Sequence, residues 1–207
     1  MEINDIKENF IKDIKDHALT VVREDGLYRH IRCQRPDSWV YGFEIITWPG
    51  YLAYVGDMGD YVFKRIPDMF DFFGSNGINP SYWSEKVVAE CYDKIREFSE
   101  EEYRKQVEKW RDNIVEDIET PYDGDEEDRA IEQNAFIQAV NNELLDYLVD
   151  SISEEECYRL LSEFKHNDIQ CYDAWEWDFK TFTYRYIWAL YAITWAIGQY
   201  NNIKKGE

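Results

Sequence analysis

The fold is decided by residues 18–66, ALTVVREDGLYRHIRCQRPDSWVYGFEIITWPGYLAYVGDMGDYVFKRI. This stretch holds five short runs rich in β-branched and aromatic residues, which are enriched in strands. Turn-forming groups separate the runs: Glu-Asp-Gly, Arg-Pro-Asp-Ser, Pro-Gly and Gly-Asp-Met-Gly. Because short strands joined by tight turns pair with their neighbours in the chain, the stretch predicts a meandering antiparallel sheet of about four to five strands.

Helical spacing is found on both sides of this predicted sheet. Before it, residues 3–14 place isoleucine and phenylalanine at helical intervals with charges between them, which predicts an N-terminal amphipathic helix. After it, Ser99 and Ser153 are each followed three residues later by Glu, a capping-box pattern that marks the start of a helix. The chain beyond residue 97 therefore predicts about four helices, at roughly 99–118, 128–150, 153–164 and 184–197.

For two of these helices the sequence predicts more detail. In the helix near 128–150, the spacing predicts that these residues face inward: Ile131, Ala135, Val140, Leu144 and Leu148. The last helix is apolar nearly all round, which predicts that it is the central helix of a helical lobe. Its apolar run, Ile187 to Ile197, is shorter than the roughly 20 residues that span a bilayer, so we expect burial and not membrane insertion.

Together these patterns predict an α+β protein. The 207 residues are 44% hydrophobic and 17% aromatic, which is enough to build one packed domain. We therefore expect a single domain, 1–207, with a sheet-rich lobe at 1–96 and an acidic helical lobe at 97–207. The N-terminal residues lack the apolar segment of a secretory signal, which predicts a cytoplasmic protein.

The charge is concentrated in one part of the chain. The formal net charge is −20, and residues 97–156 hold 21 acidic against 5 basic residues. A dense array of carboxylates can mimic nucleic-acid phosphates and is steered to basic grooves, so this segment is the candidate partner-binding surface. Its candidate residues are Glu100, Glu101, Glu108, Asp112, Glu116, Asp117, Glu119, Asp123, Asp125, Glu126, Glu127 and Asp128. The same charge argues against direct binding of nucleic acid, which requires a basic patch.

The sequence contains no recognisable catalytic constellation. His17, His30 and His166 are far apart and fit no metal-ligand pattern, and the four cysteines form no CxxC pair. Glycine-rich phosphate-binding motifs and the GxSxG nucleophile motif do not occur. We therefore expect no catalytic residue, no metal and no cofactor, and we expect the cysteines to be reduced and structural.

The glycine-framed acidic segment Gly56-Asp57-Met58-Gly59-Asp60 allows two interpretations. In a hairpin turn, Gly56 and Gly59 would take positive φ and Asp57 would bond within its own turn. In a ligand site, Asp57 and Asp60 would hold a cation or act as a paired acid and base. The turn is the favoured interpretation, and the ligand site supports an alternative function as a nucleotide-binding sponge or a nucleotide-directed enzyme.

Three segments of the chain resemble a family of uncharacterised bacteriophage accessory proteins. The segments are TWPGYLAYVGDMGDYVFKRIPDMFDFF at 47–73, INPSYWSEKV at 78–87 and IREFSEEEYRKQV at 95–107. The resemblance brings no catalytic residues with it. It implies a class of task, because small phage proteins of this kind are often inhibitors of host defence, anti-CRISPR proteins among them.

Charge and resemblance together favour a phage-encoded inhibitor that binds protein. Its acidic surface would occupy the basic nucleic-acid-binding groove of a host defence protein in the host cell cytoplasm, without contact to nucleic acid or membrane. A homodimer is compatible with this task. Trp175 and Trp177 lie in a polar stretch and are candidates for exposed anchors of an interface.

Overall fold

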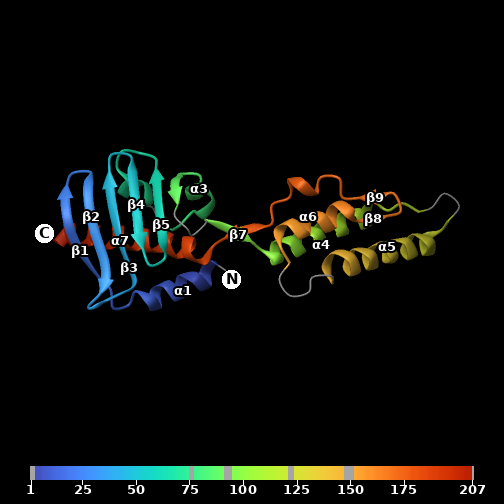
Figure 1. Ribbon diagram of the computed structural model, residues 1–207, viewed down its shortest axis with the longest axis horizontal. Helices are drawn as coiled ribbons and strands as arrows, with labels where there is room; N and C mark the ends of the chain where they lie inside the picture. The colour runs from blue at the N-terminus through green and yellow to red at the C-terminus, as the bar shows by residue number, and fades with distance from the viewer. Residues whose placement is uncertain (1–2, 75–76, 91–94, 121–123, 147–151, 207) are drawn as a thin grey trace. The chain divides into compact units, whose positions relative to one another are not determined.

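The structure is a computed structural model that describes residues 3–74, 77–90, 95–120, 124–146 and 152–206. The chain has an α+β fold and divides into two compact units (Figure 1). We call residues 1–96 together with 182–207 the sheet-bearing unit, and we call residues 97–181 the helical unit.

The elements of the sheet-bearing unit are α1 (Ile3–Asp13), β1 (Ala18–Asp25), β2 (Tyr28–Arg35), β3 (Ser38–Trp48), β4 (Tyr51–Gly56), β5 (Gly59–Lys64), α2 (Met69–Phe73), α3 (Pro80–Ser84), β6 (Val87–Glu90) and α7 (Tyr184–Gly206). Those of the helical unit are α4 (Glu100–Asp117), α5 (Glu126–Val140), the π-helix η1 (Asn141–Leu145), α6 (Glu154–Glu163), β8 (Lys165–His166), β9 (Ile169–Gln170) and the 3₁₀ helix η2 (Ala174–Glu176). Strands β7 (Arg96–Phe98) and β10 (Lys180–Phe182) form a separate two-stranded sheet.

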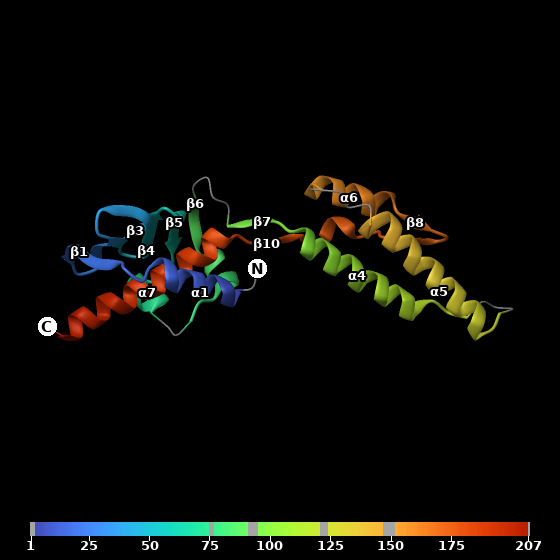
Figure 2. The same cartoon turned by 90° about the horizontal axis from the view of Figure 1, so that it is seen from below.

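Strands β1 to β6 form one antiparallel sheet in which each strand pairs with its neighbour in the sequence. Successive side chains of a strand point to opposite faces, and the helices α1 and α7 lie on one face (Figure 2). The buried residues of that face include Ile31, Cys33, Phe43, Ile45, Leu52, Tyr54, Tyr61 and Phe63. The predicted meander is confirmed. The structure adds a sixth strand, β6, which follows the short helices α2 and α3.

The last helix, α7, packs against this sheet. Trp188 of α7 belongs to the same core as Phe10 of α1 and Phe43 of β3. Its ring meets theirs edge to face, with centroids 5.0 and 6.0 Å apart, and its Nε1 donates to Asp13 Oδ2 at 3.0 Å. The prediction that this helix is the centre of the helical lobe is wrong, because an apolar surface all round a helix indicates burial without indicating the partner element.

The position of α7 also changes the expected division of the chain. The predicted helical lobe at 97–207 ends instead at residue 181, and residues 182–207 belong with residues 1–96. The first boundary was visible because acidic residues become frequent after residue 97. The second was not, because nothing in the composition marks the point where the chain returns to the sheet.

The helical unit has a core of its own. Its buried residues are Tyr103, Val107, Phe136, Val140, Leu144, Leu145, Cys157, Leu161, Phe164, Cys171, Ala174 and Phe179. They come from α4, α5, η1, α6 and the segment that follows α6. On α4 and α6 the buried residues lie four apart, Tyr103 with Val107 and Cys157 with Leu161, so each helix turns one face to this core.

The inward face predicted for the second helix of this unit is partly wrong. Val140 and Leu144 are buried, whereas Ile131 is 62% exposed and Ala135 is exposed. Leu148 lies outside the described residues. The reason is the buried ring of Phe136, because a helix that turns positions 136 and 140 inward turns positions 131 and 135 toward solvent.

Serine side chains cap two helices of this unit as predicted. Ser99 Oγ accepts a hydrogen bond from the amide of Glu102, and Ser153 Oγ accepts one from the amide of Glu156, each at 3.2 Å. At Ser99 the backbone amide donates to the carbonyl of Phe179 at 2.7 Å instead of to the glutamate of a capping box. The start of α4 is therefore tied to the segment that precedes β10.

Candidate protein-binding surface

The helical unit carries almost all of the excess charge of the chain. It holds 26 acidic against 8 basic residues, a net of −18, and the sheet-bearing unit holds 17 against 15, a net of −2. Six of the eight basic residues form ion pairs inside the helical unit. Few cations of this unit are therefore left to offset the remaining carboxylates.

A row of carboxylates runs along the exposed side of α4. Glu101, Glu108, Asp112 and Glu116 follow one another at intervals of seven, four and four residues, and all four are exposed. Residues four apart lie on the same face of a helix, about 6 Å apart along its axis. Asp112 pairs with Arg111 at 2.8 Å. Within the described residues, the other three carboxylates have no ion-pair partner.

The other predicted residues of α4 lie near the two ends of this row. Glu100 pairs with Arg104 at 2.9 Å in the first turn. Asp117 and Glu119 are exposed at the C-terminal end, where the last turn of α4 has no basic residue. Asp123 lies outside the described residues. Acidic side chains at a helix C-terminus oppose the helix dipole, so these two contribute charge at a small cost in stability.

The helix predicted at roughly 128–150 begins earlier in the structure, at Glu126. Asp125 is the N-cap of α5, and Glu126, Glu127 and Asp128 form its first turn. Asp125 Oδ1 accepts from the amides of residues 127 and 128 at 2.8 and 3.2 Å, and Asp128 Oδ2 accepts from the amide of residue 125 at 3.0 Å. This is a capping box made by two aspartates, which differs from the pattern of serine followed by glutamate at Ser99 and Ser153. These exposed residues therefore stabilise α5 as well as adding charge.

The acidic surface of the helical unit extends beyond residue 156, where the predicted acidic segment ended. Five further exposed carboxylates belong to the helical unit: Glu163, Asp168, Asp173, Glu176 and Asp178. The sequence does not indicate an acidic surface there, because residues 157–207 contain as many basic as acidic residues. Three of those basic residues, Arg185, Lys204 and Lys205, lie in the sheet-bearing unit. The five carboxylates and these three basic residues fall in different units only because α7 packs with the sheet.

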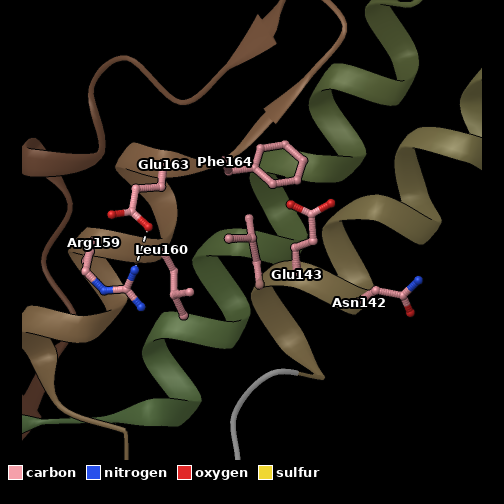
Figure 3. A pocket seen from close by; sticks show the side chains of 7 residues that line it. Asn142, Glu143, Arg159, Leu160, Glu163 and Phe164 are labelled. Atoms are coloured by element: carbon pink, nitrogen blue, oxygen red, sulfur yellow. Dashed lines mark hydrogen bonds and ion pairs between the residues drawn. The ribbon is translucent and has the colours of Figure 1, made fainter.

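A pocket of about 400 Å³ opens between η1 and α6 in the helical unit (Figure 3). Leu144, Leu160 and Phe164 provide its apolar lining. Its charged lining is Glu143 on η1 and the Arg159 and Glu163 ion pair on α6. An apolar lining with carboxylates at its edge suits a long cationic side chain, which has an aliphatic stem and a charged tip.

The wall formed by η1 owes its shape to a change in helical winding. The amide of Asp146 donates to the carbonyl of Asn141 at 2.7 Å, a bond that spans five residues instead of four. The Tyr103 hydroxyl donates to the carbonyl of Leu144 at 3.2 Å, and Arg111 Nη1 donates to Asn141 Oδ1 at 2.8 Å. Two side chains of α4 thus hold this π-helical turn, a kind of turn that is frequent at functional sites.

The glycines of the segment 56–60 form the turn between β4 and β5. Gly56 and Gly59 pair at the ends of the two strands, and Gly59 has a φ of 100°. Gly56 does not have the predicted positive φ. It needs to be glycine because a Cβ there would lie 2.6 Å from the Cβ of Phe43.

The carboxylates of this turn hold backbone groups. Asp57 Oδ2 accepts from the amide of Tyr41 at 2.9 Å, and Asp60 Oδ1 accepts from the amide of Gly56 at 3.2 Å. Asp57 therefore bonds to β3 and not to its own turn as predicted. Tyr41 has a φ of 59°, which is strained for a bulky residue, and the bond to Asp57 helps to hold it. The geometry favours the structural interpretation of the turn.

We expect Gly59→Ala to destabilise the sheet-bearing unit, by about 1 to 3 kcal/mol, because a residue with a Cβ is strained at positive φ. Thermal melting of the full chain checks this prediction. Gly198→Ala is the matched control, because a Cβ at Gly198 in α7 meets nothing within 4 Å and alanine favours a helix. Equal melting temperatures of the Gly59→Ala variant and the wild type would contradict a structural role of Gly59 in this turn.

The described cysteines are buried and free. Burial raises the pKa of the Cys33 and Cys157 thiols to about 12 and that of Cys171 to about 11. Because the thiolate is the reactive form, these pKa values agree with structural roles. Cys91 lies outside the described residues.

The histidines have protein contacts of a structural kind. His17 Nε2 lies 3.2 Å from a main-chain carbonyl, and burial lowers the pKa of His17. His30 Nε2 lies 2.9 Å from Glu44 Oε2, and the His166 ring packs on Phe136 at 5.6 Å. Searching the described ranges finds no group of three or more His, Cys, Asp or Glu residues that could hold a metal ion.

In the part of the chain that the structure describes, no helix combines the length and the apolar character needed to cross a membrane. What the protein binds must be inferred from its own charge and geometry, because comparison with protein-family models, with curated proteins and with solved structures gives no match.

Proposed function

We propose that this protein is an inhibitor that binds another protein through its helical unit, whose carboxylates occupy a basic groove that otherwise holds nucleic acid. The observation that carries the proposal is the separation of charge, −18 in the helical unit and −2 in the sheet-bearing unit. Like charges repel and destabilise a compact unit, and a few lysines on the same helices would relieve this cost. A use in binding explains why the charge is kept together.

The arrangement of the carboxylates supports this use. The row on α4 is carried by a helix, so its charges are spaced before any partner arrives and little ordering is needed on binding. A field of one sign steers a basic surface toward the unit and raises the association rate. The pocket beside Glu143 adds a place for one arginine or lysine side chain of the partner.

The resemblance of residues 47–107 to bacteriophage accessory proteins supports a narrower form of the proposal. In that form the partner is a host defence protein, for example a CRISPR nuclease, and the inhibitor acts in the cytoplasm of the infected cell. Such nucleases hold nucleic acid in positively charged channels, which are the surfaces that a carboxylate array would recognise.

Affinity capture with the tagged full-length chain tests the proposal. We expect the proteins retained from a bacterial lysate to include nucleic-acid-binding proteins, and we expect added duplex DNA or RNA to release them. A tagged Glu108→Lys, Glu116→Lys, Asp117→Lys variant is the control, and it should retain much less of the same proteins. Retained proteins that neither nucleic acid nor salt releases, or that the variant retains equally, would contradict the proposal.

A further inference from the structure

Two large aromatic side chains stand exposed on the helical unit. Tyr172 is 74% exposed and Trp175 is 73% exposed, the highest values among the large hydrophobic residues that the structure describes. Trp177, the other residue expected to be an exposed anchor, is instead partly buried against the core of this unit. Large aromatic rings left in water on a packed unit are typical of binding surfaces, in which Trp and Tyr supply much of the energy.

The turn that carries these two rings is held firmly at its base. Cys171 and Ala174 are buried on either side of Tyr172, and Phe179 is fully buried at the end of the segment. The amide of Trp177 donates to the carbonyl of Ala174 at 3.1 Å within the 3₁₀ helix η2. The rings are therefore displayed on a fixed backbone, which reduces the entropy lost when they are covered.

Neighbouring elements hold the same turn from outside. The hydroxyl of Tyr158 on α6 donates to the carbonyl of Trp177 at 2.6 Å, and Gln106 Nε2 on α4 donates to the carbonyl of Asp178 at 2.7 Å. The Trp177 ring packs on the rings of Trp110 and Phe179, with centroids 6.3 and 6.1 Å away. Two helices of the helical unit, α4 and α6, thus fix the turn in place.

The charges around the rings define what they can bind. Asp173 follows Tyr172 in the chain and Glu176 follows Trp175, and both carboxylates are exposed. An arginine guanidinium can stack flat on an aromatic ring while its edge pairs with a carboxylate, whereas a lysine ammonium is a strongly hydrated point charge. An exposed ring followed in the chain by an exposed carboxylate, present twice on one turn, is therefore suited to arginine.

We propose that Tyr172 and Trp175 form an arginine-binding anchor of the helical unit, which stacks arginine side chains of the partner protein's basic surface. This inference rests on the proposed function, because it gives that binding surface its contact residues. It adds chemistry that charge alone does not supply, namely a preference for arginine over lysine. A surface that binds by charge alone would treat the two cations nearly alike.

Fluorescence anisotropy with two labelled peptides of equal length and charge, one of arginine and one of lysine, tests the anchor on the full-length chain. We expect the wild type to bind the arginine peptide at least tenfold more tightly than the lysine peptide. The Tyr172→Ala, Trp175→Ala variant should lose that preference, because its affinity for the arginine peptide should fall to the level of the lysine peptide. Both side chains are exposed, so its thermal melting should match the wild type.

Two further variants keep the test specific. Trp39→Ala removes a tryptophan that is 44% exposed in the sheet-bearing unit, and it should keep the arginine preference. Trp175→Phe keeps a ring at position 175 and should retain most of the preference. Equal binding of the two peptides by the wild type, or a preference that survives loss of both rings, would overturn the anchor.

The outcomes also separate the anchor from the proposed function. Equal binding of both peptides that weakens as salt is added would remove the anchor and leave charge-driven binding in place. No binding of either peptide would overturn both. Loss of the arginine preference in the Tyr172→Ala, Trp175→Ala variant, with binding of the lysine peptide unchanged, would support the anchor.

Discussion

Replacing Glu108, Glu116 and Asp117 with lysine should abolish inhibition while leaving the helical unit folded. The three carboxylates are exposed, and within the described residues they have no ion-pair partner. Each reversal removes one attraction and adds one repulsion toward a basic groove, which weakens the binding free energy by about 1 kcal/mol. The total of about 3 kcal/mol corresponds to roughly a hundredfold loss of affinity.

These three positions separate binding from folding better than residues 125–128 do. Lysine at Asp125 or Asp128 would remove the capping box of α5 and place cations at the positive end of its dipole. Lysine in place of Glu116 and Asp117 would lie at the C-terminal end of α4, where cations are favourable. Circular dichroism and thermal melting should therefore show an unchanged fold for the triple variant.

The matched control reverses the same number of charges in the sheet-bearing unit. Glu8, Asp16 and Glu85 are exposed residues of that unit, and their replacement with lysine raises the net charge of the chain by the same amount. We expect nearly wild-type binding from this control, because the charges are in the other unit. Equal losses in both variants would show that net charge matters and the helical unit does not.

Trp188→Asp should unfold the sheet-bearing unit. Trp188 is fully buried between α1 and the sheet, so the change leaves a large cavity, which costs about 3 to 5 kcal/mol. It also buries a carboxylate whose neighbour, Asp13, is another carboxylate, which adds several kcal/mol. The sum approaches the whole stability of a typical domain, about 5 to 15 kcal/mol.

Near-ultraviolet circular dichroism and the yield of folded protein measure this effect. Trp39→Asp is the control, because Trp39 is 44% exposed and its replacement buries no charge. We expect the control to fold and the Trp188→Asp variant to lose its tertiary signal. A Trp188→Asp variant that melts like the wild type would mean that α7 does not form the centre of this core.

The sheet and the helix starts could be predicted because their signals are local. Residues 18–66 carry both the strand-forming runs and the turns between them, and the observed pairing follows the chain. Ser99 and Ser153 mark two helix starts through side-chain bonds to nearby amides. His30 and Cys33 lie three residues apart on β2, so strand alternation places them on opposite faces, and of the two only Cys33 is buried.

The features that escaped prediction depend on distant contacts. The partner of α7 is chosen by the rings of Phe10 and Phe43, which lie far from it in the chain. The rotation of α5 is set by Phe136, which packs on Trp110 of α4 and on Phe164, the residue that follows α6. Neither choice is visible in the periodicity of the helix concerned.

Part of the candidate surface could likewise be predicted from the sequence, and part could not. The acidic row on α4 could be predicted, because exposure of charged residues on an amphipathic helix follows from its spacing. The extension of the acidic surface to Asp173 and Glu176 could not, because it depends on which unit each segment joins. The exposure of Trp175 was foreseen as a possibility, but only the fold separates it from the partly buried Trp177.

Competition between this protein and nucleic acid for one basic partner tests the central claim most directly. The affinity of the partner for its nucleic acid would be measured with increasing amounts of the wild-type chain, at about 50 mM and about 200 mM salt. We predict that the apparent dissociation constant of the nucleic acid rises in proportion to the added protein, and that this effect weakens at least tenfold at the higher salt. An apparent dissociation constant that reaches a plateau, or that depends equally on added protein at both salt concentrations, would contradict binding of the acidic helical unit in the nucleic-acid groove.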